Sequence, residues 1–223
     1  YDVIFPSEYA VVQMAQEGRL EQLDWSKIRP TNRAGEVYSV DFERDFIPPM
    51  LANLKKLEEK ENFNYFEYAA PYFFQNMTLV YNSEVVPLAE IQQQQWDILS
   101  NPNYKVAIRN SSRDTFMYAL KQLGFSANTT SAAEINQAEQ YLINQKKTMG
   151  NQIAYLTDEV LDDIPNEVYD VGIVFSGDAF SIMDANDKIR FYTPTKGTNI
   201  AIDGMVIPKN AENKEMAFKF FSH

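Results

Sequence analysis

Apolar and polar positions repeat along this chain with two different periods, one typical of strands and one typical of helices. Short runs of β-branched and aromatic residues are separated by longer segments in which apolar residues recur at helical spacing. We expect strands at 3–6, 65–81, 104–108, 153–156, 168–175, 189–192 and 205–207, and helices at 8–17, 50–61, 88–99, 112–123, 131–147, 158–164, 176–183 and 212–221. This alternation predicts an α/β fold with a mostly parallel sheet.

The ends of the expected helices carry capping signals. Ser7 can cap the first helix, and Gly18 can end it. Ser131 and Glu134 have the spacing of a capping box at the start of another helix. Four consecutive glutamines, Gln92–Gln95, fall within an expected helix, where they predict a solvated face rather than a prion-like tract.

Charge and composition exclude several classes of function. The chain has 223 residues, with 20 Lys and Arg against 31 Asp and Glu, and therefore a net charge of −11. Nucleic acid and anionic lipid are poor partners, because binding them usually needs a basic surface. There is no cysteine, and the single histidine is His223. A disulfide framework, thiolate zinc sites and cysteine or histidine catalysis therefore lose the residues that they need.

The two ends of the chain predict a fragment. No charged and apolar signal segment precedes the first expected strand. The last expected helix carries Phe218, Phe220 and Phe221, an apolar group that we expect further chain to cover. We therefore expect truncation at both ends. No apolar run approaches the roughly 18 residues of a membrane span.

Six segments, in order along the chain, carry recognisable motifs. They are Tyr1–Tyr9, Pro71–Phe74, Arg113–Leu120, Leu123–Thr130, Gly172–Phe180 and Pro194–Lys214. The first segment runs Tyr-Asp, three apolar residues, Pro, Ser and then an aromatic residue, and the last contains Ile-Pro-Lys-Asn-Ala. Taken together, in this order and spacing, they resemble the polyamine-binding proteins of ABC importers, the spermidine/putrescine type.

The resemblance implies an α/β, two-lobed, periplasmic-binding-protein-like (type II) fold. Lobe one would hold residues 1–70 and regain the chain at 203–223, and lobe two would hold 71–202. It also implies an extracytoplasmic solute-binding protein that captures putrescine or spermidine between its lobes by hinge motion. The protein would deliver this polyamine to the membrane subunits of an ABC importer.

Further expectations follow from the same resemblance. Such a protein is not an enzyme, and it needs no cofactor or metal. It is monomeric and does not bind nucleic acid. It lies in the periplasm or, anchored by lipid, on the outer face of the cell membrane.

Six residues are candidate ligand contacts by this resemblance. A polyamine needs carboxylates for its ammonium ends and aromatic faces for its stem. The candidates are Ser7, Tyr9, Asp114, Phe175, Asp178 and Asp203. Asp203 is the expected anchor, and Phe175 would stack on the ligand in place of a family Trp.

Each candidate also has a purely structural interpretation. Asp203 could be an exposed residue at a strand start, Asp178 a helix cap, and Asp114 a first-turn residue favoured by the helix dipole. Phe175 could be a core aromatic, and Ser7 could be a plain N-cap. The sequence pattern by itself leaves both interpretations open.

Several further positions depart from the family pattern. Ala201 stands where the spermidine type often has Trp, and Ser111 stands where it often has Asp. Both changes remove ligand-facing chemistry. Asp114 replaces a usual Glu and is one methylene shorter. Glu8 replaces a small residue, and its carboxylate either joins the site or points to solvent.

Other functions stay open at this stage. The losses at Ala201 and Ser111 favour another organic cation, or an amino-acid-like or thiamine-like solute, on the same fold. A carboxylate-based hydrolase would need Asp178 and Asp203 on either side of a sugar-sized groove. The chain has no nucleophile elbow, phosphate loop, zinc-protease motif or dinucleotide fingerprint. An adhesin built on the same fold is a further alternative.

Overall fold

The computed structural model describes all 223 residues, and the chain divides into two compact units. Unit 1 combines Tyr1–Phe74 with Ala201–His223, and unit 2 is the continuous segment Gln75–Ile200. The divisions expected after residues 70 and 202 fall within a few residues of these points. Unit 1 is therefore discontinuous in sequence, with unit 2 inserted into it.

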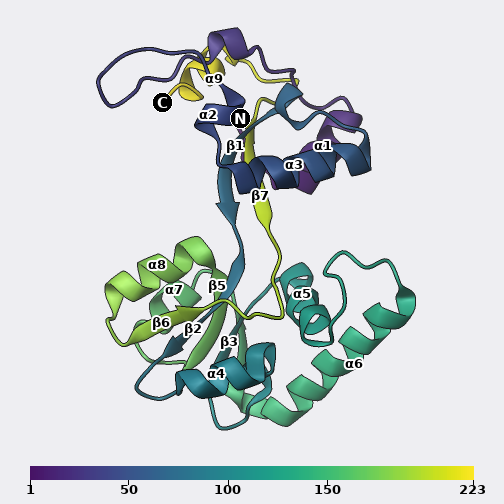
Figure 1. The fold of residues 1–223 in the computed structure, drawn as a ribbon, viewed down its shortest axis with the longest axis vertical. Coiled ribbons are helices and arrows are strands. Elements are labelled where there is room, and N and C mark those ends of the chain that lie inside the picture. The colour runs from purple at the N-terminus through teal and green to yellow at the C-terminus, as the bar shows by residue number, and fades with distance from the viewer. The chain divides into compact units, whose positions relative to one another are not determined.

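Unit 2 is built around a five-stranded sheet with the order β4-β3-β5-β2-β6 (Figure 1). Its strands are β2 (Met77–Asn82), β3 (Val106–Arg109), β4 (Ile153–Leu156), β5 (Val171–Phe175) and β6 (Ile189–Tyr192). β3 pairs in parallel with β4 and β5, whereas β2 runs antiparallel to both of its neighbours, β5 and β6. The prediction of a mostly parallel sheet is therefore wrong for β2.

The direction of β2 has a topological reason. Parallel neighbours are joined by a helical crossover, as between β3 and β4. Neither sheet neighbour of β2 follows it directly along the chain, so no such crossover sets its direction.

Helices cover both faces of this sheet, as Figure 1 shows. They are α4 (Leu88–Gln94), α5 (Ser112–Gln122), α6 (Ala132–Met149), α7 (Val160–Asp163) and α8 (Ser176–Ala185), with short 3-10 helices η3 (Gln95–Ser100) and η4 (Gly150–Gln152). Successive residues of β2 face opposite cores. Leu79 packs in the cluster that holds Trp96 and Tyr118, and Val80 packs in the cluster that holds Ile182. Because both faces are covered, the whole of β2 is buried.

The glutamine run does not form the uniformly solvated face that the sequence predicts. Gln92 and Gln93 are exposed, but Gln95 is buried and has a φ of 58°. The Gln95 amide oxygen accepts a hydrogen bond from the Thr195 backbone N–H at 2.7 Å, and its amide nitrogen donates to the Tyr192 hydroxyl at 3.2 Å. Gln95 therefore ends α4 and ties it to the segment after β6, a partner that no local period reveals.

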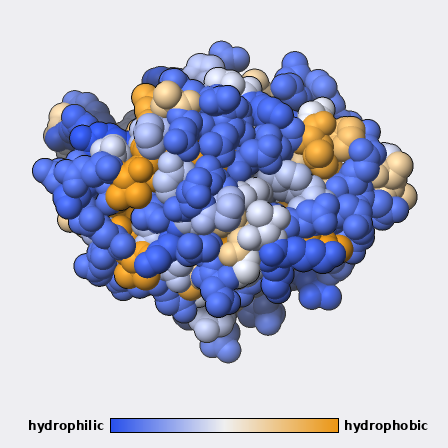
Figure 2. All heavy atoms as spheres, turned by 90° about the horizontal axis from the view of Figure 1, so that it is seen from below, coloured by the Kyte–Doolittle hydropathy of each residue, from blue (hydrophilic) through white to orange (hydrophobic).

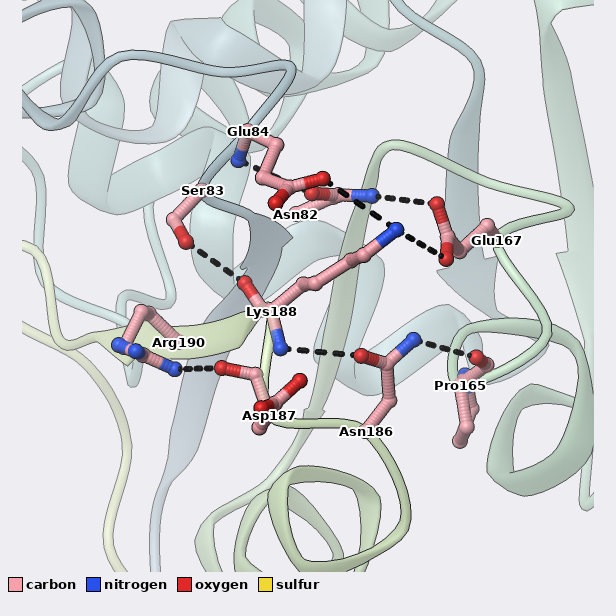
Figure 3. A network of polar contacts seen from close by, with 9 residues as sticks. All are labelled: Asn82, Ser83, Glu84, Pro165, Glu167, Asn186, Asp187, Lys188 and Arg190. Carbon is pink, nitrogen blue, oxygen red and sulfur yellow. Dashed lines mark hydrogen bonds and ion pairs between the residues drawn. The ribbon is translucent and has the colours of Figure 1, made fainter.

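A polar network fastens the loops at one end of the unit 2 sheet (Figure 3). The Lys188 ammonium lies 3.2 Å from the Glu84 carboxylate and 3.0 Å from the Glu167 carboxylate. The Asn82 amide donates to Glu167 at 3.1 Å. The hydrogen bond with Lys188 lowers the pKa of Glu167, and the same bond raises the pKa of Lys188. Since these groups are solvated, the network fixes loop geometry more than it adds stability.

Unit 1 surrounds a two-stranded sheet of β1 (Ala69–Gln75) and β7 (Ala201–Val206). Its helices are α1 (Glu8–Gln16), α2 (Phe42–Asp45), α3 (Pro48–Glu61) and α9 (Lys214–Phe220), with 3-10 helices η1 (Trp25–Lys27) and η2 (Tyr65–Glu67). Pro71 lies within β1, whose pairing with a single partner strand leaves an edge that tolerates a missing N–H.

The strand expected at 3–6 is reduced to isolated bridges against β7. Ile4 and Val206 exchange backbone hydrogen bonds of 3.1 and 3.0 Å, and the Gly204 N–H donates to the Pro6 carbonyl at 2.9 Å. Pro6 has no N–H to return, so the ladder is interrupted there. The pairing resumes with a bridge between Ser7 and Asp203.

The C-terminal aromatic residues, which we expect further chain to cover, are largely covered within unit 1 itself. Phe218 and Phe221 are 6% and 7% exposed and pack in a core cluster with Leu23 and Ile28 of unit 1. Phe220 points away and is 51% exposed. Chain from the first part of unit 1 therefore covers most of this helix face.

One face of the molecule is mainly polar (Figure 2), in keeping with the net charge of −11. Figure 2 shows one hydrophilic face on which apolar side chains gather in small separate groups. Scattered apolar residues of this kind are ordinary on soluble proteins. No helix combines the length and the apolar character needed to cross a membrane.

Gly204 tests the packing of β7. A Cβ at this position would overlap the Tyr65 hydroxyl and lie 3.0 Å from the Ala69 Cβ. Tyr65 and Ala69 are both fully buried and cannot move aside. We expect Gly204→Ala to lower the free energy of unfolding by about 1–3 kcal/mol, as overpacked cores do, in a urea titration.

Gly177→Ala is the matched control, because a Cβ there meets nothing within 4 Å. This control should keep the stability of the parent. A Gly204→Ala protein as stable as the parent would contradict the close approach of Tyr65.

Candidate functional site

β7 presents one buried and one accessible face, and Asp203 lies on the accessible one. Ile202, Gly204 and Val206 are buried, whereas Ala201 and Asp203 are partly exposed. Asp203 lies in the middle of this strand rather than at its start, because β7 begins earlier than the sequence predicts. Since Ala201 shares its face, an aromatic ring is missing next to Asp203 where the spermidine type often has one.

Ser7 is joined to Asp203 across 196 positions of the chain. The Ser7 hydroxyl donates to one Asp203 carboxylate oxygen at 2.7 Å. Ser7 has the backbone geometry of the α1 N-cap, but its side chain makes no capping hydrogen bond. The interpretation of Ser7 as a plain cap is therefore wrong. A short bond of this kind holds a carboxylate in one orientation.

The neighbours of Ser7 on α1 have separate places. The Glu8 carboxylate accepts a hydrogen bond from the Ile202 backbone N–H at 3.1 Å, so it does not simply point to solvent. It therefore brings a second carboxylate next to β7. Tyr9 is 53% exposed at the start of the same helix.

Tyr65 lies beneath this part of β7. It is fully buried, and its hydroxyl has no hydrogen-bond partner. Burial raises the pKa of Tyr65, and the negative charges of Glu8 and Asp203 raise it further. Unit 1 therefore gathers two carboxylates and two hydroxyls around one strand, an arrangement that suits a cation.

The unit 2 candidates Phe175 and Asp178 lie at the carboxyl ends of the parallel strands of its sheet. β3 and β5 are parallel neighbours, so their carboxyl ends meet at the same edge (Figure 1). Phe175 is the last residue of β5, and Asp178 lies in the first turn of α8, which follows at once. Ligands of open α/β sheets bind at this edge.

Arg109 occupies the same place and was not among the predicted site residues. It is the last residue of β3, and its guanidinium carbon lies 4.4 Å from the centre of the Phe175 ring. One guanidinium nitrogen lies 3.9 Å from an Asp178 carboxylate oxygen. The sequence places Arg109 at the end of an expected strand. It does not reveal that Phe175 and Asp178 lie against this side chain.

Asp178 is partly withdrawn from solvent. Burial raises its pKa, the charge of Arg109 lowers it, and the negative Asp158 raises it again. The net effect is an upward shift from the ordinary value. A nearby cation therefore stabilises the ionised form of Asp178.

Asp114 and Ser111 occupy the start of α5, after β3. The Ser111 hydroxyl accepts a hydrogen bond from the Asp114 N–H at 3.4 Å and so caps the helix. Serine keeps the capping role that an aspartate could also perform, but it brings no carboxylate. Asp114 is 9% exposed in the first turn.

The structure thus brings the predicted residues together in two groups. Ser7 and Asp203 meet in unit 1, and Phe175 and Asp178 meet in unit 2. Asp114 stands in the first turn of its own helix. The ligand contacts of all six candidates remain predictions.

A comparison with protein-family models finds a match over residues 1–223 to the model described as bacterial extracellular solute-binding protein. The chain belongs to this family. Membership places the protein among solute-binding proteins.

Relatives of known name match the whole chain. The spermidine/putrescine-binding periplasmic protein of Salmonella typhimurium is 31% identical over 100% of this chain and 58% of its own length. The putrescine/cadaverine-binding protein of Pseudomonas aeruginosa is 26% identical over 99% of this chain and 59% of its own length. The chain therefore spans less than two thirds of the relatives that it matches.

A solved structure supports the same family fold. The spermidine/putrescine ABC transporter substrate-binding protein of Streptococcus pneumoniae superimposes with a TM-score of 0.72 at 26% identity. The match covers 100% of this chain and 62% of the other. The predicted two-lobed, periplasmic-binding-protein-like fold is confirmed.

The raised pKa of Asp178 predicts how stability changes with pH. Below the ordinary value of 3.8 the carboxyl group is protonated in both states. As the pH rises from there through the higher folded pKa, the unfolded chain ionises first and the folded protein loses stability. The stability gain of Asp178→Asn over the parent should therefore be larger at about pH 7 than at about pH 3.

Urea denaturation across this pH range measures the difference. Asp184→Asn, at an exposed position of the same helix, controls for the loss of one negative charge. If the free energy of unfolding of the Asp178→Asn protein and that of the parent change equally with pH, burial does not shift the pKa of this carboxyl group.

Proposed function

We propose that this protein captures a polyamine, putrescine or spermidine, and delivers it to the membrane subunits of an ABC importer. The observation that carries the proposal is the Ser7–Asp203 pair, whose 2.7 Å hydrogen bond holds an accessible carboxylate on β7. The names of the relatives, which bind spermidine, putrescine and cadaverine, point in the same direction.

The chemistry of unit 1 suits one ammonium end. An ammonium withdrawn from water needs an anionic partner and hydrogen-bond acceptors. Asp203 provides a charge with fixed direction, and Glu8 adds a second negative charge next to the same strand. The net charge of −11 also favours the approach of a cation.

The remaining parts of the proposal follow the family. The ligand would be bound without covalent chemistry, with residues from both units contributing to its capture. The protein would act as a monomer outside the cytoplasm, in the periplasm or held by lipid at the outer face of the membrane. Ser7, Tyr9 and Asp203 of unit 1, with Asp114, Phe175 and Asp178 of unit 2, would contact the ligand.

A second candidate ligand is a solute with one ammonium and one carboxylate. Arg109, at the sheet edge of unit 2, favours it because a guanidinium binds carboxylates. A hydrolase fits less well. Each predicted acid already has a polar neighbour, a hydroxyl for Asp203 and a guanidinium for Asp178.

Asp203→Asn tests the anchor. The amide keeps an acceptor for the Ser7 hydroxyl but loses the charge that an ammonium needs. Because a hydrogen bond to a charged group contributes about 1.5–3 kcal/mol, we expect binding of putrescine and spermidine to weaken by more than about tenfold. Isothermal titration calorimetry measures the affinity, and circular dichroism checks the fold.

Glu43→Gln removes one charge from an exposed position of α2 in the same unit, and it should bind like the parent. An unchanged affinity of Asp203→Asn would exclude Asp203 as the anchor. Absence of heat with either polyamine at millimolar concentration would reject polyamine binding itself.

A further inference from the structure

The Arg109 guanidinium lies against the two unit 2 side chains that a cationic ligand would use, Phe175 and Asp178. Its guanidinium lies over the Phe175 ring at 4.4 Å and near Asp178 at 3.9 Å. An aromatic face and a carboxylate are the two partners that an ammonium seeks. Unit 2 therefore contains a seat for a cation that is already filled by the chain itself.

The seat is held loosely. The 3.9 Å separation between Arg109 and Asp178 exceeds that of an ordinary hydrogen bond. The two side chains keep 25% and 32% of their exposure, so water reaches both. Arg109 is the last residue of β3, and its long stem has several rotatable bonds.

An added cation has to compete with Arg109 for Phe175 and Asp178. Asp178 lies near Asp158 as well as Arg109, and the pKa of Asp178 records both charges. A second cation brought to Phe175 and Asp178 meets the positive guanidinium first, and the two repel each other. A carboxylate brought to the same place meets a guanidinium that can hold it.

We propose that Arg109 determines ligand specificity by competing with the ligand for the cation seat formed by Phe175 and Asp178. It lowers the affinity for a diamine and favours a ligand that carries a carboxylate at its second end. The effect on diamines rests on the proposed polyamine function. The seat itself rests only on the contacts of Arg109 with Phe175 and Asp178.

Arg109→Gln is the central variant, because it removes the charge and keeps a polar side chain at this position. Calorimetry compares putrescine with γ-aminobutyrate, which also has four carbons but carries a carboxylate in place of one aminomethyl end. We expect the variant to bind putrescine about tenfold more tightly than the parent and to bind γ-aminobutyrate more weakly.

Two controls separate the seat from the overall charge. Lys105→Gln removes a positive charge from an exposed position just before the same strand and should not change the ratio of the two affinities. Arg109→Lys retains a cation and should stay close to the parent. Unchanged or weaker putrescine binding in Arg109→Gln overturns the proposed competition.

A second measurement examines the seat without the transported ligand. Carbon NMR of the Asp178 carboxyl group follows its titration in the parent and in Arg109→Gln. We expect the pKa of Asp178 to be higher in the variant, and methylguanidinium to bring it back toward the value in the parent. The parent itself should not respond to methylguanidinium, because Arg109 fills the seat.

The two measurements distinguish two failures. An Asp178 resonance in Arg109→Gln that ignores methylguanidinium overturns the cation seat, whether or not putrescine binds. A resonance that responds while neither protein takes up putrescine supports the seat and rejects the polyamine function.

Discussion

The pairing of the first residues of the chain with β7 is the contact on which unit 1 and its candidate residues depend. Backbone bonds between Ile4 and Val206, and from Gly204 to Pro6, set the register. That register places Ser7 opposite Asp203 and lets their side chains meet at 2.7 Å. A shift of one residue would turn Asp203 toward the core. The register therefore decides whether the carboxylate is available to a ligand.

The two units treat their carboxylates in different ways. In unit 1, Asp203 accepts a hydrogen bond from the Ser7 hydroxyl, and Glu8 lies next to the same strand. In unit 2, Asp178 faces a guanidinium that offsets its charge. The carboxylates of unit 1 attract a cation directly. At Asp178, a cation has to displace Arg109, whereas an anion can bind to Arg109.

Local sequence signals predict much of the fold. The helix expected at 112–123 is observed as Ser112–Gln122, and Ser131 caps the helix that follows it. These features depend on neighbours within one turn. The capping box is only half formed, because the Ser131 N–H donates to the Thr129 hydroxyl. The missing half depends on a competing acceptor that the motif does not include.

Features that depend on distant residues could not be predicted in the same way. The direction of β2 follows from which strands become its neighbours, and the burial of Gln95 follows from Tyr192 and Thr195. The candidate site shows the same limit. The family motif marks Phe175 and Asp178, but nothing near them in sequence reveals that Arg109, from another strand, lies against both.

The insertion of unit 2 into unit 1 also orders events in time. A ribosome makes all of Gln75–Ile200 before it makes β7, so unit 2 has every residue that it needs while unit 1 still lacks a strand. Closing β1 on β7 across an unfolded segment of that length is entropically costly. Prior folding of unit 2 would reduce that cost. The hydrogen bond from Ser7 to Asp203 can therefore form only after the whole of unit 2 has been made.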